Sequence, residues 1–86
     1  MNFEEIFAAR VHELRLKKGI SQKQLGEAIG LSHKAISTIE SGSRSTSIAK
    51  LVALAQFFDV STDYLLGLRD TPKDAGGETP PLQPGA

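Results

Sequence analysis

The sequence predicts an all-α domain of five short helices over residues 1–69, followed by a disordered tail over residues 70–86. Apolar residues recur at a spacing of three or four, and no segment shows the alternation of a strand. The composition changes after Arg69, where four prolines and three glycines accompany a single large aliphatic residue. Such a segment buries too little apolar surface to offset the entropy of ordering it.

Composition excludes several classes of protein. At 86 residues the chain has room for one domain, whose thin core would benefit from self-association. The absence of cysteine excludes disulfides and thiolate metal sites, and His12 and His33 lack the further ligands of a structural zinc site. No apolar stretch approaches the roughly 20 residues that span a bilayer, and the acidic N-terminus lacks the basic region of a signal peptide. We therefore expect a cytoplasmic protein without membrane contact, metal or cofactor.

The first two helices have clear start and stop signals. A capping-box pattern at residues 2–5 predicts the start of the first helix, and Gly19 predicts its end. Its expected apolar face comprises Phe3, Ile6, Phe7, Val11 and Leu14. A second capping box at residues 21–24 opens a short helix that stops at Gly30. The inward residues expected there are Leu25, Ala28 and Ile29.

A serine precedes each of the three remaining helices, where its hydroxyl can cap the first turn: Ser32, Ser47 and Ser61. The third helix is expected to stop at Gly42, and a polar loop follows at residues 43–46. The fourth helix is expected over residues 48–58, with the apolar stripe Ile48, Leu51, Leu54, Ala55 and Phe58. The fifth is brief and ends at Leu66, before a glycine.

The second and third helices together carry the functional signal. The second is too short to be stable alone, so it must pack steeply on the third. Gly26 lets the two backbones approach, and Gly30 forms the turn between the helices. The apolar residues expected to pack between the two helices are Leu25, Ile29, Leu31, Ile36 and Ile39. This arrangement is that of a helix-turn-helix.

Charge is distributed unevenly along a chain whose formal net charge is zero. Residues 15–50 hold seven basic and two acidic residues, a net charge of +5, and the flanking segments are acidic. This pattern suits a modest electrostatic footprint on phosphate. The outward face of the third helix is polar and suits the major groove of DNA, with Ser32, His33, Lys34, Ser37 and Thr38 exposed on it.

Residues 10–67 resemble the Xre/Cro–cI family of helix-turn-helix regulators, to which the phage repressors belong. The residues that fall at the family's spacing are Gln22, Leu25, Gly26, Ile29, Gly30, Ile36, Ile39, Glu40 and Gly42. The resemblance implies a five-helix domain of the phage-repressor type that binds palindromic operators in double-stranded DNA as a homodimer. It also implies that the third helix is the recognition helix.

The resemblance assigns roles to individual residues. It implies phosphate contacts from the start of the second helix and from the loop, through Gln22, Ser43, Arg44 and Ser45. It implies base reading by His33, Lys34 and Thr38, with Ser32 and Ser37 beside them. Arg15 and Glu40 match a pair that forms a partly buried salt bridge. Three residues depart from the family pattern, namely Leu16, Ser43 and Thr46, and the apolar Leu16 suggests an additional contact surface.

We interpret the chain as a transcriptional regulator, with repression as the expected sign, and not as an enzyme. No nucleophile–base pair, carboxylate pair or phosphate-binding glycine loop can be recognised, so no catalytic residue is assigned. A restriction-system controller would be a subtype of this interpretation. The rival interpretation is a protein-interaction module, such as an antitoxin that neutralises a protein partner.

Overall fold

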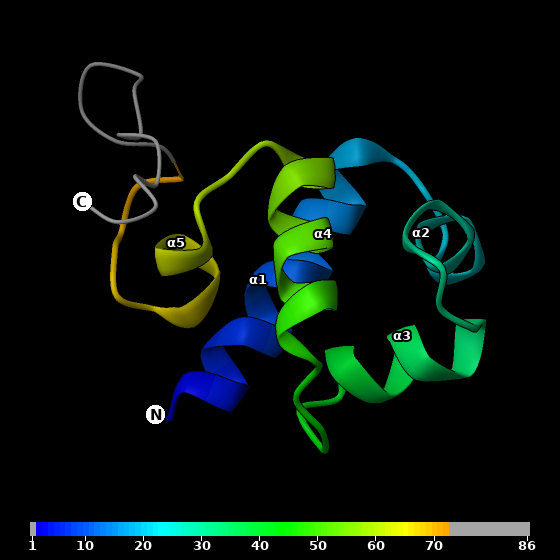
Figure 1. Ribbon diagram of the computed structural model, residues 1–86, viewed down its shortest axis with the longest axis horizontal. Helices are drawn as coiled ribbons and strands as arrows, with labels where there is room; N and C mark the ends of the chain where they lie inside the picture. Colours follow the sequence, from blue (N-terminus) through cyan, green and yellow to red (C-terminus); the bar gives the residue numbers. More distant parts are fainter. Residues whose placement is uncertain (1, 73–86) are drawn as a thin grey trace, which may run out of the picture.

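The computed structural model describes residues 2–72, and in that range the chain forms five α-helices and no strand (Figure 1). The helices are α1 (Phe3–Lys18), α2 (Gln22–Ile29), α3 (His33–Glu40), α4 (Ile48–Phe58) and α5 (Thr62–Leu66). The predicted all-α, five-helix fold is confirmed. None of these helices is long and apolar enough to cross a membrane. The predicted tail lies outside the described residues from position 73 onward.

Side-chain caps explain why the helices begin where they do. At every helix start, an oxygen of the preceding side chain accepts a hydrogen bond from a backbone amide three residues later; the capping residues are Asn2, Ser21, Ser32, Ser47 and Ser61. At α2 the capping box is complete, because Gln24 also accepts from the Ser21 amide at 2.8 Å. Each cap contributes about 1 kcal/mol, which matters in helices this short.

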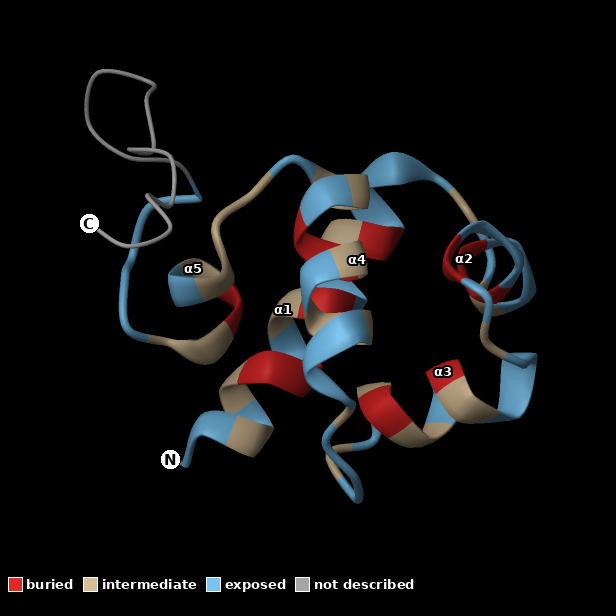
Figure 2. Ribbon diagram, in the orientation of Figure 1, coloured by how far each residue is buried: buried red, intermediate tan, exposed pale blue. Residues whose placement is uncertain are grey.

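The helices surround a single core. In Figure 1, α4 occupies the centre with α1 behind it, α5 flanks one side, and α2 and α3 lie on the other. The helix segments that are coloured as buried lie where the helices face one another (Figure 2). All five helices contribute to this core, which comprises Phe7, Val11, Leu25, Ile29, Ile36, Ile39, Leu54, Ala55 and Leu65.

Three apolar residues that the sequence placed inward are exposed instead. Ile48 and Phe3 are 81% and 56% exposed, because each is the first residue of its helix and the first turn projects beyond the packed region. Ala28 is also exposed. The inward face of α2 is shifted from the predicted one, because Gly26 takes the place of Ala28 beside Leu25 and Ile29.

Two long basic side chains tie separate helices together. Lys50 in α4 donates from Nζ to the Ile29 carbonyl oxygen at 2.6 Å, so a cation sits at the C-terminal end of α2, where the helix dipole favours it. Arg10 in α1 donates to the carbonyl oxygens of Tyr64 and Arg69, and its guanidinium lies 4.1 Å from the centre of the Tyr64 ring. These contacts fix α2 and α5 against the central helices.

Gly26 sets the distance between α2 and the turn that follows it. Its carbonyl oxygen accepts from the Leu31 amide at 2.8 Å, which folds the turn back over the helix. A Cβ atom at this position would lie 3.2 Å from the carbonyl carbon of Leu31 and from the carbonyl oxygen of Ser32, and closer still to the Leu31 oxygen. The atoms in the way belong to the backbone, so α2 and α3 would have to move apart to admit a side chain.

Replacing Gly26 with alanine should therefore destabilise the fold. In an unobstructed helix this change gains up to about 1 kcal/mol from helix propensity. Here we expect a net loss of about 1–3 kcal/mol in the free energy of unfolding, because a methyl group forced into a packed site displaces its surroundings. Urea denaturation measures the change, with Glu27→Ala, an exposed neighbour on α2, as the control. A stabilised Gly26→Ala protein would show that the turn does not press on α2.

Candidate nucleic-acid interface

The outward face of α3 is polar and accessible. Ser32, His33, Lys34 and Ser37 are exposed. Thr38 is half-buried, and its hydroxyl donates to the Lys34 carbonyl oxygen at 2.9 Å. The face therefore presents one cation, one imidazole and several small polar groups to a ligand.

A groove of about 720 Å³ separates α3 from the loop before α4. Five of the residues assigned from the sequence line it: Ser32, Lys34, Thr38, Arg44 and Ser45. Gln22, His33, Ser37 and Ser43 lie outside its lining. Its basic residues are Lys34, Arg44 and Lys50, and the ammonium of Lys50 already binds the end of α2. Lys34 of α3 and Arg44 of the loop thus both line an open, positively charged groove.

The loop that carries Arg44 is anchored to the end of α3. The Ser41 hydroxyl donates to the Thr38 carbonyl oxygen at 2.8 Å and lies 2.7 Å from the Ser43 hydroxyl. The Ser43 hydroxyl also donates to the Thr38 carbonyl oxygen at 3.4 Å, so Ser43 helps to cap α3, a role that the sequence did not indicate. Anchoring at this point sets the position from which Arg44 extends.

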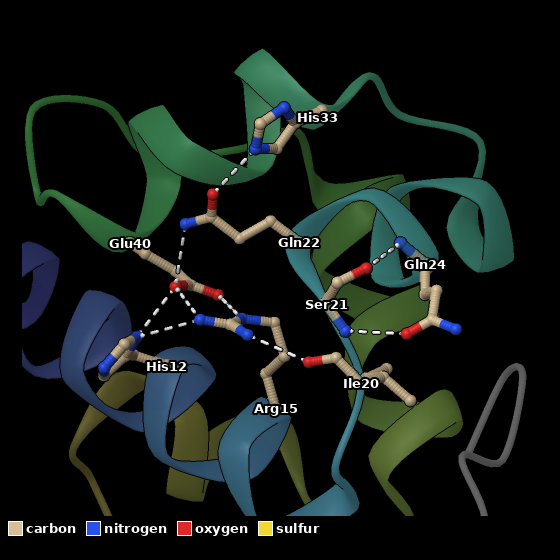
Figure 3. Close-up of polar contacts among 8 residues, drawn as sticks. All are labelled: His12, Arg15, Ile20, Ser21, Gln22, Gln24, His33 and Glu40. Atoms are coloured by element: carbon tan, nitrogen blue, oxygen red, sulfur yellow. Dashed lines mark hydrogen bonds and ion pairs between the residues drawn. The ribbon is translucent and has the colours of Figure 1, made fainter.

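A buried carboxylate joins α3 to the first helix (Figure 3). The Glu40 side chain is only 4% exposed. Arg15 of α1 donates to it from Nε at 2.6 Å and from Nη2 at 3.1 Å. The same guanidinium donates from Nη1 to the Ile20 carbonyl oxygen at 2.9 Å. The structure thus places the two residues of the expected salt bridge in direct contact.

Two more side chains complete the surroundings of Glu40. His12 Nδ1 lies 2.8 Å from Glu40 Oε1, and Gln22 Nε2 lies 3.2 Å from the same oxygen. A carboxylate only accepts hydrogen bonds, so His12 Nδ1 and Gln22 Nε2 each donate a proton to Glu40. His12 is exposed, and its contact with Glu40 was not predicted from the sequence. The available signal was its position three residues before Arg15, which places both on one face of α1.

The hydrogen bonds keep Glu40 ionised despite its burial. Desolvation by itself raises the pKa of a carboxyl group, because it disfavours the charged form. At Glu40 the hydrogen bonds from Arg15, His12 and Gln22, with the charge of Arg15, outweigh this effect and lower the pKa below its ordinary value. The bond to Glu40 likewise raises the pKa of Arg15. Both groups therefore stay charged at neutral pH.

Gln22 connects this buried cluster to the exposed face of α3. Its Nε2 donates to Glu40, and its Oε1 lies 3.0 Å from His33 Nε2 (Figure 3). The resemblance assigned Gln22 to phosphate, whereas here its amide is bonded on both sides within the protein. One N–H of Nε2 remains for an external acceptor, so the internal bonds and a phosphate contact are compatible.

Residues 11–65 match the sequence profile of the helix-turn-helix family. The chain belongs to the helix-turn-helix family. The HTH-type transcriptional regulator YobD of Bacillus subtilis is 37% identical over 67 residues, which cover 78% of this chain and 60% of YobD. ImmR, a regulator of the same organism, is 34% identical over 64 residues, or 74% of this chain and 50% of ImmR. The chain thus spans between half and three-fifths of these relatives.

Two solved structures share the fold. The P22 c2 repressor, in complex with a synthetic operator, has a TM-score of 0.68 and 35% identity, covering 70% of this chain and 91% of the repressor chain. The restriction-modification controller protein C.AhdI of Aeromonas hydrophila has a TM-score of 0.65 and 33% identity, covering 71% of this chain and 92% of C.AhdI. The resemblance to phage-repressor-type regulators is confirmed. These relatives are regulators and not enzymes, which agrees with the expectation from the sequence.

Replacing Glu40 with glutamine should cost stability in a pH-dependent way. Because the pKa of Glu40 is lower in the folded chain than in the unfolded chain, the ionised carboxylate stabilises the fold above the unfolded pKa of about 4.3. That contribution is lost as the pH falls through the folded pKa. We expect Glu40→Gln to lower the free energy of unfolding by about 3 kcal/mol at neutral pH. The deficit relative to wild type should shrink in acid, as measured by urea denaturation at several pH values.

Glu27→Gln is the matched control, because Glu27 is exposed on α2 and undergoes the same chemical change. We expect it to remain within about 0.5 kcal/mol of wild type. A deficit of Glu40→Gln that stayed constant from neutral to acid pH would contradict an ionised, stabilising Glu40.

Proposed function

We propose that the protein is a sequence-specific transcriptional regulator that binds double-stranded DNA with α3 as its recognition helix. The observation that carries this proposal is the exposed polar face of α3 beside a groove lined by Lys34 and Arg44. The similar P22 c2 repressor was crystallised with an operator, which supports the same use of the fold here. The major groove admits an α-helix and presents hydrogen-bonding groups that distinguish the base pairs.

Within this proposal, α3 would contact base edges, whereas the loop and Gln22 would contact the phosphate backbone. Lys34 on α3 would donate to guanine O6 or N7 on a base edge. The Thr38 hydroxyl proton is taken by the Lys34 carbonyl oxygen, so Thr38 would offer its methyl group and its oxygen as an acceptor. Arg44 and Ser45 in the loop, and the remaining N–H of Gln22, would contact backbone phosphates. Phosphate contacts would fix the position of the protein along the duplex, and base contacts would determine which DNA sequence it prefers.

We also propose that the protein acts as a homodimer on palindromic operators in the cytoplasm, and that it represses by occupying them. Lys50 of the groove is bound to the Ile29 carbonyl oxygen, so Lys34 and Arg44 of one copy would give weak binding, which a second copy would reinforce. Two copies related by a two-fold axis would place their α3 helices about 34 Å apart, one turn of DNA. The exposed Leu16 supports an additional contact surface on α1.

Removing Lys34 and removing Arg44 should weaken DNA binding in different ways. Lys34→Ala should cost about 1–3 kcal/mol per half-site on a duplex selected from random DNA, and should relax the preference at one base position. Arg44→Ala should weaken binding to selected and scrambled duplexes alike, and lower the slope of log K against log salt by about 0.9 per chain. Binding titrations at several salt concentrations measure both effects and the number of chains per duplex.

Lys17→Ala is the control, because it removes the same charge from the exposed end of α1, outside the groove. We expect it to leave base preference unchanged. If Arg44→Ala altered base preference while Lys34→Ala did not, the roles of helix and loop would be reversed. One chain per duplex would contradict the dimer. A wild-type protein that bound no duplex would favour a protein partner instead.

A further inference from the structure

Hydrogen bonds run from Glu40 through Gln22 to His33, and the buried Glu40 carboxylate determines which atom donates and which accepts at each step. Glu40 is ionised and accepts hydrogen bonds only. Gln22 meets it at 3.2 Å, so the amide must turn its nitrogen toward Glu40 Oε1. The opposite orientation would place two acceptor oxygens against each other. The carboxylate therefore directs the Gln22 oxygen outward, toward α3.

The Gln22 orientation in turn determines where His33 carries its proton. Gln22 Oε1 is an acceptor and lies 3.0 Å from His33 Nε2, so Nε2 must be the protonated nitrogen. A neutral imidazole has one N–H, which leaves Nδ1 as a bare acceptor. In Figure 3 the second ring nitrogen of His33 points away from Gln22. His33 is exposed as the first residue of α3, so this acceptor is open to a ligand.

We propose that His33 reads a base edge as a hydrogen-bond acceptor through Nδ1, and that Gln22 and Glu40 are the positioning residues that set this polarity. The inference rests on the proposed DNA-binding function and adds a specificity to it. In the major groove, the exocyclic amino groups of adenine (N6) and cytosine (N4) are the donors that such an acceptor would recognise. At the base that it contacts, His33 thus favours adenine or cytosine over guanine or thymine.

Lys34, the next residue after His33, is a hydrogen-bond donor where His33 is an acceptor. Lys34 has three donors and no acceptor, and it favours the acceptors O6 and N7 of guanine. Two adjacent side chains at the start of α3 then select unlike bases. An imidazole without a fixed tautomer could donate to one kind of base or accept from the other. The bond that His33 donates to Gln22 therefore adds discrimination between bases as well as order.

Nitrogen NMR of the free protein tests the polarity without DNA. At a pH where the imidazole is uncharged, His33 should show a protonated Nε2 and a bare Nδ1. The substitution Gln22→Met keeps a side chain of similar size but removes the hydrogen bonds to Glu40 and His33. It should therefore move the His33 ring toward a mixture of tautomers. Gln56→Met makes the same change at an exposed site on α4 and should leave His33 unaffected. A protonated Nδ1 in the wild-type protein would overturn the inference.

Base analogues test the reading itself on a duplex selected from random DNA. His33→Ala first identifies the base whose preference His33 sets. At that base, an analogue without the exocyclic amino group (purine for adenine, or 2-pyrimidinone for cytosine) should weaken wild-type binding about tenfold. The analogue should have little effect on His33→Ala. Gln22→Met should lose most of this discrimination, even if it also binds every duplex more weakly through a lost phosphate contact.

The outcomes separate the inference from the function on which it rests. Equal binding of the natural base and the analogue, or a preference for guanine or thymine at that base, would overturn the acceptor role while leaving DNA binding established. Full discrimination in Gln22→Met would overturn the positioning role of Gln22. A wild-type protein that bound no duplex would overturn both the inference and the proposed function.

Discussion

Glu40 places an ionised carboxylate in the interior of the domain, where its side chain is almost fully buried. Such a group is strongly destabilising unless charge and hydrogen bonds compensate for the lost water. Glu40 is the last residue of α3, and its partners come from two other helices, namely Arg15 and His12 from α1 and Gln22 from α2. Because these bonds have narrow geometric limits, satisfying Glu40 orients α3 relative to both helices. The hydrogen bonds of Glu40 therefore both stabilise the domain and set the orientation of α3.

Polar contacts help to hold the helices in place, because the apolar core is small. Nine buried residues form the apolar core cluster of the described chain. Domains of this size have a marginal apolar contribution to stability. Capping oxygens at all five helix starts, together with the long side chains of Arg10 and Lys50, hold short helices in place around that core. Gly26 contributes by allowing the turn to close over α2.

The helices could be predicted from the sequence, whereas several contacts between them could not. Capping residues and helix-ending glycines are local signals. The caps placed all five helix starts, and glycines placed the ends of α1, α2 and α5, whereas α3 ends at Glu40, two residues before the expected Gly42. Periodicity identifies a face but not how far a partner helix covers it, so Ile48 was placed inward although it is exposed. The bond from Lys50 to Ile29 joins residues 21 positions apart and has no local signature. At Gln22 the resemblance indicated a phosphate contact, whereas only the structure shows its bonds to Glu40 and His33.

We infer that Glu40 and the three side chains bonded to it, Arg15, His12 and Gln22, hold in place the side chains that would contact DNA. A crystal structure of the protein bound to a duplex selected from random DNA is the decisive experiment. We expect α3 to lie in the major groove with the Gln22–Glu40 and Gln22–His33 bonds retained, and the remaining N–H of Gln22 to face a phosphate. A duplex bound to another face of the domain, or a Gln22 side chain turned away from Glu40, would contradict it.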